Sequence, residues 1–145
     1  MAYLTDGHPT TVTFYALGTG VVIKLKETSV TPPGIAAGGE NDTTTMRNAT
    51  WRTKQPKHLK TLTNGACTFQ YDPAIYDQIL SIIGINGQVL VEFADGSTLL
   101  FWGWLDDFTP GECVEGTMPT ATGTVICSNQ NADGTEVAPV YSAAA

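Results

Sequence analysis

The chain has 145 residues with a formal net charge of −7, and 42% of its residues are hydrophobic while only 14% are charged. This length suits one domain, which buries enough surface to fold without a disulfide or a metal ion. The three cysteines lack C-x-x-C spacing, which argues against a disulfide framework and against a zinc site. The first residues show no signal-peptide pattern, and no apolar run approaches the ~20 residues of a membrane helix. We therefore expect a soluble protein made in a reducing compartment.

The charged residues are unevenly distributed along the chain. All seven Lys and Arg residues lie at or before residue 60, together with four acids, whereas residues 61–145 hold ten acids and no base. Such separation favours a molecule with opposed charged faces, although drift on a solvated surface would produce the same pattern.

Two β-rich runs open the chain. Residues 11–17 (TVTFYAL) and 20–26 (GVVIKLK) are separated by glycine, and the second run alternates apolar and polar residues. The pattern predicts a hairpin with one buried face. Residues 27–49 then contain PPG and GG and show no period, which predicts a long loop of the kind that is usually functional or disordered.

Residues 65–71 (GACTFQY) form the next predicted strand, and the one predicted helix follows at about residues 73–83. Asp72 is a suitable N-cap, Pro73 suits the first turn, and Gly84 can end the helix. Four isoleucines make an apolar stripe on it, so the helix is expected to pack on a sheet.

Asp95-Gly96 lies between two apolar runs, residues 88–93 and 98–105, which is a strong hairpin signal. The second run, TLLFWGWL, is apolar on both sides, so both of its faces should be covered. Gly103 within it indicates a bulge or a close backbone approach. Further strands are expected at residues 112–118 and 122–127, and the polar tail at residues 129–145 is expected to be mobile.

These elements predict a mainly β fold. We expect an antiparallel β-sandwich or small barrel with one flanking helix, formed by residues 1–128 as a single domain.

The search for chemistry finds little. The two histidines belong to no catalytic motif, so we expect neither an enzyme nor a cofactor. Asn41-Asp42 and Asp106-Asp107 lack the ligand spacing of a calcium loop, so no metal is expected. The two Asn-x-Thr sequons, at Asn41 and Asn48, are interpreted as chance products of composition. The basic residues between 47 and 60 could contact nucleic acid, but a pI near 4.5 argues against a dedicated nucleic-acid binder.

The order of these features resembles a known family. The segment from Asp42 to Thr53 (DTTTMRNATWRT), the strand pair FADGSTLLFWG and the closing TGTV are the most specific parts. Over residues 10–128 the chain resembles the major tail tube proteins of long, non-contractile-tailed bacteriophages. We expect it to be without the additional immunoglobulin-like domain of some members.

The resemblance implies a structural virion protein with the tail tube fold. Its subunits would form hexameric rings that stack into a hollow tube, assembled in the host cytoplasm, through which DNA passes without specific binding. Implied partners are further copies of the chain, the tape measure protein, the tail terminator and the baseplate or tail-tip proteins, with no membrane.

Two sets of site residues follow as hypotheses. We predict that residues 27–53 are mobile in the monomer and become ordered between rings, with contacts from Asp42, Thr43, Thr44, Thr45, Met46, Arg47, Trp51 and Arg52. Because acids repel phosphates, acidic residues are expected to face the lumen, and the candidates are Glu92, Asp106, Asp107, Glu112 and Glu115.

Two alternatives stay open. One is a related tube or virion component, such as a type VI secretion tube subunit, a tail terminator or a capsid decoration protein. The other is a carbohydrate-binding β-sandwich in which Trp51, Trp102 and Trp104 stack on sugars.

Overall fold

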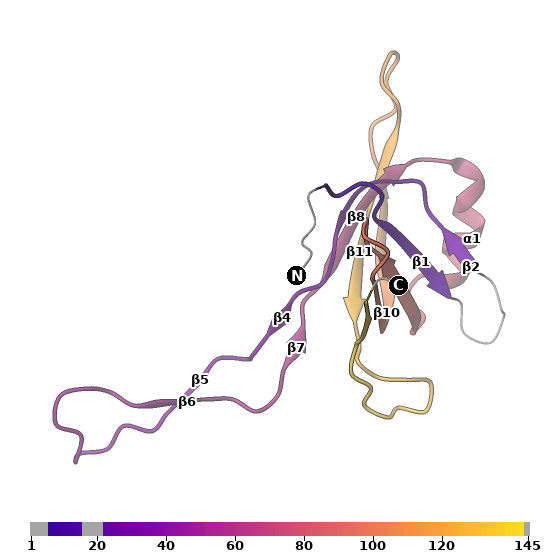
Figure 1. Cartoon of the computed structure of the whole chain (residues 1–145). Helices are drawn as coiled ribbons and strands as arrows, with labels where there is room; N and C mark the ends of the chain where they lie inside the picture. Colours follow the sequence, from indigo (N-terminus) through magenta and orange to yellow (C-terminus); the bar gives the residue numbers. More distant parts are fainter. Residues whose placement is uncertain (1–5, 16–21, 144–145) are drawn as a thin grey trace.

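The computed structural model describes residues 6–15 and 22–143, and most of its elements are antiparallel strands (Figure 1). The main eight-stranded sheet has the order β2-β1-β9-β10-β11-β8-β3, with β12 paired to β10. Its strands are β1 (Thr11–Tyr15), β2 (Val22–Lys24), β3 (Glu27–Thr31), β8 (Gly65–Gln70), β9 (Gly87–Glu92), β10 (Thr98–Pro110), β11 (Thr120–Cys127) and β12 (Val140–Ser142). The predicted mainly β class is confirmed. No helix in the described residues is long and apolar enough to span a membrane.

One face of the main sheet forms the core. Alternate residues of β8, β9 and β11 and of the middle of β10 are buried, as the period of two requires. The sheet curls so that β3 approaches β1. The backbone N–H of Val12 donates to the Glu27 carboxylate at 3.0 Å across this approach. The buried apolar residues of the strands are Val12, Phe14, Ile23, Leu62, Cys67, Phe69, Val89, Val91, Phe101, Leu105, Ala121 and Val125, and Leu25, just after β2, is buried with them.

The predicted helix is present at the predicted place, on one side of the sheet (Figure 1), where it contacts β10. A 3₁₀ turn, Pro73–Ile75, leads into α1, Tyr76–Ile82. The Asp72 carboxylate accepts a hydrogen bond from the Ala74 N–H at 3.0 Å, which caps the turn. Only Ile79 and Ile82 of α1 are buried, so the helix covers the core with a narrower stripe than predicted.

Both predicted hairpins are confirmed for the described residues. Phe14 of β1 pairs with Ile23 of β2, and the connection between these strands lies outside the described residues. β9 and β10 pair across the Asp95-Gly96 turn, where Gly96 has a φ of 90° and the Asp95 carboxylate accepts from the Ser97 N–H.

Strand β10 is longer than predicted and pairs with three other strands. It pairs with β9 and β12 along its first half and with β11 from Gly103 onward, with a register shift between Leu105 and Asp107. A Cβ at Gly103 would lie 2.2 Å from the Ile126 carbonyl oxygen, so the predicted close backbone approach is present. The faces of β10 differ, because Phe101 is buried whereas Trp102 and Trp104 on the other side are half-buried.

Three predicted elements differ in the structure. Residues 27–31 are strand β3 of the main sheet rather than the start of a loop. Residues 112–118 are not a strand but belong to the loop between β10 and β11. The tail predicted to be mobile returns to the sheet, where Tyr141 of β12 pairs with Leu99.

Candidate assembly surfaces

Residues 32–64 form a long arm that leaves the main sheet (Figure 1). Two short ladders build it. β4 (Ile35–Ala36) pairs with β7 (Thr61–Leu62), and β5 (Glu40–Asp42) pairs with β6 (Lys54–Pro56). Leu62 is the one buried side chain in this segment. A two-stranded hairpin without a core is at best marginally stable in water, so the arm has its surface available for another molecule.

The segment predicted as a long loop, residues 27–49, contains three short strands, β3, β4 and β5, and irregular connections between them. Gly38 and Gly39 have positive φ values and bend one side of the hairpin instead of ending all regular structure. The pairing partners lie after residue 53, so no local period reveals them. Because almost no side chain of the arm is buried, its sequence also shows no alternation of apolar and polar residues that would predict strands.

The tip of the arm, residues 43–53, is held by its own polar side chains. The Asp42 carboxylate accepts from the Thr44 N–H at 2.9 Å and from Arg52 Nη1 at 3.2 Å. The hydrogen bonds from Thr44, with a smaller contribution from Arg52, lower the pKa of Asp42 below its usual value. The Asn48 side chain accepts from the Thr45 N–H and donates to the Trp51 carbonyl.

The predicted contact residues lie in the arm tip, except Asp42, which ends β5 and leads into it, and they have two roles. Asp42, the three threonines at positions 43–45 and Arg52 make hydrogen bonds within the tip. Met46, Arg47 and Trp51 are exposed, and Trp51 as a whole residue is 81% accessible to solvent. These three side chains are free to contact another molecule.

The arm has the opposite charge to the remainder of the chain. It carries five basic and two acidic residues, while the remaining sequence carries two basic and twelve acidic residues. Two arm bases pair within the arm, Arg52 with Asp42 at 3.2 Å and Lys54 with Glu40 at 2.9 Å. The arm therefore has a net charge of +3, and the remaining sequence has a net charge of −10.

The five acids predicted for the lumen are exposed but do not form one cluster. Asp106 and Asp107 are adjacent at the register shift of β10. Glu92 ends β9 opposite Thr98, roughly 25 Å along β10 from them at ~3.3 Å per residue. Glu112 and Glu115 lie in the loop beyond the end of the sheet.

A surface that sequence reasoning missed lies on the outer face of β11 and its neighbours. Thr120, Thr122 and Thr124 alternate along β11 and pair with Gln70, Thr68 and Ala66 of β8. Asp107 pairs with Thr124 from the other side. The alternation T-x-T-x-T is visible in the sequence, but only the sheet places it beside the Thr68 hydroxyl of β8.

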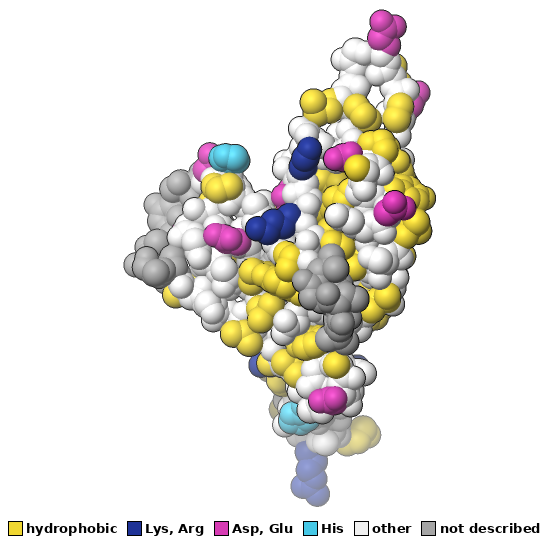
Figure 2. Space-filling view, turned by 90° about the vertical axis from the view of Figure 1, so that its right-hand side faces the viewer, with side chains coloured by type: hydrophobic (Ala, Val, Ile, Leu, Met, Phe, Trp, Pro, Cys, Tyr) yellow, Lys and Arg dark blue, Asp and Glu magenta, His cyan; other side chains and the backbone are white. Residues whose placement is uncertain are grey.

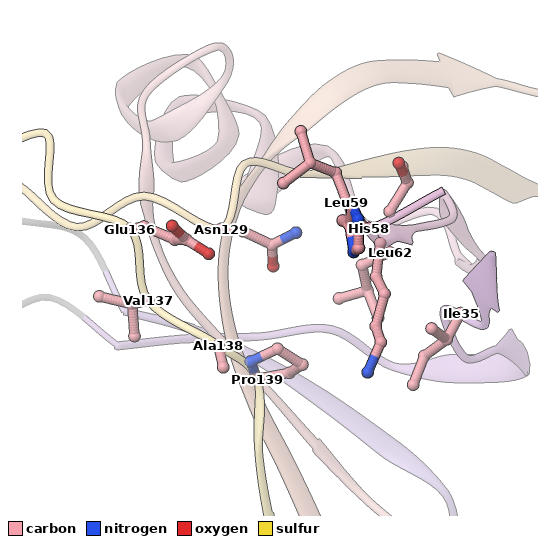
Figure 3. Close-up of a pocket in the computed structure, with 11 residues that line it drawn as sticks. Ile35, His58, Leu59, Leu62, Asn129, Glu136, Val137, Ala138 and Pro139 are labelled. Atoms are coloured by element: carbon pink, nitrogen blue, oxygen red, sulfur yellow. The ribbon is translucent and has the colours of Figure 1, made fainter. Parts of the chain in front are cut away.

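A hollow of about 490 Å³ lies at the root of the arm, where three segments meet (Figure 3). We call it the arm-root hollow. It is lined by Ile35, residues 58–62, Asn129 and residues 136–139. Sequence reasoning missed it because these segments are far apart along the chain.

The described residues contain no group of three or more His, Cys, Asp or Glu side chains that could hold a metal ion. Burial raises the pKa of Cys67 to about 12 and that of Cys127 to about 11, which keeps both thiols protonated at neutral pH. Trp51 is at the arm tip while Trp102 and Trp104 lie in β10, so the three tryptophans do not form one stacking platform.

Comparisons with known proteins identify the fold. No family model and no curated protein matches the sequence. The fold is similar to that of a chain in the cryo-EM structure of the anti-feeding prophage (AFP) baseplate, 6-fold symmetrised. The TM-score is 0.67 at 9% identity, over 88% of this chain and 94% of that chain. A chain from the tail of an empty GTA particle, determined by helical refinement in C6 symmetry, has a TM-score of 0.63 at 10% identity. That match covers 97% of this chain and 100% of the other. The architecture is therefore one found in components of phage-tail-like particles.

Proposed function

We propose that this chain is the structural subunit of a tail tube. Copies would close into six-membered rings, and the rings would stack into a hollow tube that conducts DNA. The observation that carries the proposal is the arm, an extended hairpin with paired strands and almost no buried side chain of its own.

The arm needs a partner on energetic grounds. Fixing one residue of backbone costs about 1–2 kcal/mol in conformational entropy, and Leu62 alone among the side chains of residues 32–64 is buried in return. Covering the exposed Trp51 and Met46 at an interface would contribute about 1.5–3 kcal/mol each. An arm of this length is thus explained best by contacts with another chain.

A second copy of the same chain fits the arm by charge. The arm surplus of +3 complements the −10 of the remainder, so the arm of one copy is attracted to the body of the next. Because arm and body are different surfaces, the contact is heterologous and builds closed rings or open stacks.

The sheet edges support ring closure. Within the described residues, β2 pairs only with β1 and β3 pairs only with β8, so each has a free edge. Free edges invite pairing with another chain, and joining them around a ring removes the hazard. The two similar structures come from particles solved with six-fold or C6 symmetry, which favours six copies.

The acids support a duct for DNA. Residues 61–145 contain no base, and the outer face of β11 presents hydroxyls beside Asp107. A wall of acids and hydroxyls would repel phosphates and let the genome slide. We retain the hypothesis that some of the five acids Glu92, Asp106, Asp107, Glu112 and Glu115 line the lumen.

The proposal is tested by the assembly of the purified full chain. Negative-stain electron microscopy is expected to show long tubes of uniform diameter, with six-fold symmetry in end views. Single rings without tubes would indicate a terminator instead, and a monomer at every concentration would contradict the proposal.

A further inference from the structure

The arm-root hollow is a preformed concave site with mixed walls. One wall holds Ile35, Leu59 and Leu62, and the opposite wall holds Val137 and Pro139 (Figure 3). Its volume of about 490 Å³ falls within the ~300–1,000 Å³ typical of ligand-binding clefts. Leu59 is 80% exposed and Ile35 is 72% exposed, so much of this apolar lining is open to solvent.

Asn129 gives this hollow an unused hydrogen-bond acceptor. Its φ of 52° lies in the left-handed region, which is uncommon for a residue other than glycine. Its Oδ1 atom is buried and has no hydrogen-bond partner within the described part of the chain. A buried acceptor without a donor is unfavourable, and turning the Asn129 side chain outward would let this atom accept from an N–H group of a molecule in the hollow.

The opposite end of the molecule carries a matching projection. The loop of residues 111–119, which we call the β10–β11 tip, extends beyond the sheet on the side away from the arm (Figures 1 and 2). Val114 is 50% exposed and Met118 is 63% exposed. The tip closes on itself through the Thr117 N–H, which donates to the Val114 carbonyl at 3.2 Å. Apolar side chains on a protruding loop indicate an interaction surface.

The charges of the two surfaces fit one another. The tip carries Glu112 and Glu115 and no base. The hollow has His58 and Lys60 on its arm side and Glu136 on the opposite wall. The tip acids would therefore be attracted to the arm side and repelled from the Glu136 side, which sets one orientation.

We propose that the β10–β11 tip of one copy inserts into the arm-root hollow of the next copy. Val114 and Met118 pack against the apolar lining, backbone N–H groups of the tip reach Asn129, and the tip acids face Lys60. The two surfaces lie at opposite ends of the folded molecule. The contact therefore repeats head to tail along a stack of copies and does not close into a ring. This inference rests on the proposed function, because it assigns the contact that stacks one ring on the next.

A disulfide cross-link tests the contact directly. Cys113 is an exposed thiol in the tip, whereas Cys67 is buried and Cys127 is partly buried. In a Leu59→Cys variant, oxidation of the assembled protein is expected to give a ladder of disulfide-linked dimers, trimers and longer chains on a non-reducing gel. A ladder needs two different thiols that meet between successive copies, within the ~3.5–4.5 Å Cβ separation of a disulfide.

Two controls accompany the cross-link. Leu80→Cys places an exposed thiol on α1, where Leu80 is 61% exposed, and is expected to give no ladder. Adding Cys113→Ser to the Leu59→Cys variant is expected to abolish the ladder. A ladder that persists without Cys113, or one that forms equally with Leu80→Cys, would overturn the inference.

Mixing two defective variants gives an independent test. A tip variant (Val114→Asp with Met118→Asp) keeps an intact hollow, and a hollow variant (Ile35→Asp with Leu59→Asp) keeps an intact tip. Each alone is expected to form no tubes, with an unchanged circular dichroism melt because all four side chains are exposed. Mixed, the tip of the hollow variant enters the hollow of the tip variant, so sedimentation velocity should show assemblies of twice the mass that grow no further.

The outcomes separate this inference from the proposed function. If the wild-type chain never assembles, both are wrong. Suppose instead that the wild-type chain forms tubes. If the tip variant then also forms tubes, or if the Leu59→Cys variant gives no ladder, only the inserted-tip contact is wrong.

Discussion

Removing the outer part of the arm, residues 39–56, should leave a subunit that folds but assembles poorly. Replacing residues 39–56 by an Asn-Gly turn would join the two sides of the hairpin just beyond β4 and β7. The backbones are close there, because the Lys57 N–H donates to the Gly39 carbonyl at 3.2 Å. The excised segment contains no buried side chain, whereas Leu62 at the arm root is retained.

The expected change in monomer stability is small. Surface changes away from buried features alter the free energy of unfolding by at most about 0.5 kcal/mol. Roughly halving the length of a connection lowers its closure cost by about 0.6 kcal/mol. The unfolding free energy of the shortened chain should therefore lie within about 1 kcal/mol of the wild-type value, measured by urea titration with the fluorescence of Trp102 and Trp104.

The expected change in assembly is large. Losing the burial of Trp51 and Met46 would cost about 3–6 kcal/mol per subunit, and every ~1.4 kcal/mol is a tenfold change in an equilibrium constant. The concentration at which tubes form should rise by at least about a hundredfold, measured by pelleting and electron microscopy.

A matched variant keeps the arm and removes only its contacts. Met46→Ala with Trp51→Ala leaves the hydrogen bonds of Asp42, Thr45 and Asn48 in place and should raise the critical concentration by a similar factor. Long tubes from the shortened chain at the wild-type concentration would refute the reasoning. So would a loss of stability above about 2 kcal/mol, because the arm would then belong to the cooperative core.

Three further predictions concern the sheet, the arm tip and the lumen. Gly103→Ala places a Cβ 2.2 Å from the Ile126 carbonyl oxygen and should destabilise the fold by about 2 kcal/mol or more, measured by urea denaturation. The Asp42 carboxyl, whose pKa is lowered by Thr44, should titrate below the usual range of an aspartate by NMR. Its stabilisation of the tip is present above the pKa of the unfolded chain and is lost as the pH falls through the lowered pKa. Asp106→Lys with Asp107→Lys should leave tubes able to form but slow the passage of DNA from assembled particles, because lysine binds phosphate.

Each of these predictions has a control. Gly7→Ala should leave stability unchanged, because nothing lies within 4 Å of a Cβ at that position, and an equal loss from both substitutions would argue against the close approach at Gly103. Asp42→Asn should remove the acid dependence of the tip amides, and its persistence would assign it to another group. Asp77→Lys on α1 makes one such charge reversal away from the sheet face, and DNA passage that slows equally in that variant would contradict a lumenal role for the β10 acids.

Local sequence patterns determined the elements that bury side chains. The alternation in residues 22–26 and the isoleucine stripe of α1 each reflect a face in contact with the core. The Asp95-Gly96 turn needs residue types that suit a hairpin. The sequence also predicted Asp72 as an N-cap and a close backbone approach at Gly103, because each of these features needs particular residue types. The same patterns predicted the mainly β class, and the tail-like resemblance of the sequence agrees with the fold of the two similar structures.

Tertiary structure alone decided the parts that lack a buried face. The arm pairs residues 35–42 with residues 54–62, and its exposed surface produces no hydrophobic period. The pairing of β12 with β10, the projection of residues 111–119 beyond the sheet and the arm-root hollow likewise depend on which distant segments meet. Local propensity and hydrophobic periodicity indicate which residues are buried against the rest of the same chain. The exposed surfaces have no such pattern, because they are created by segments that meet only when the whole sheet has formed.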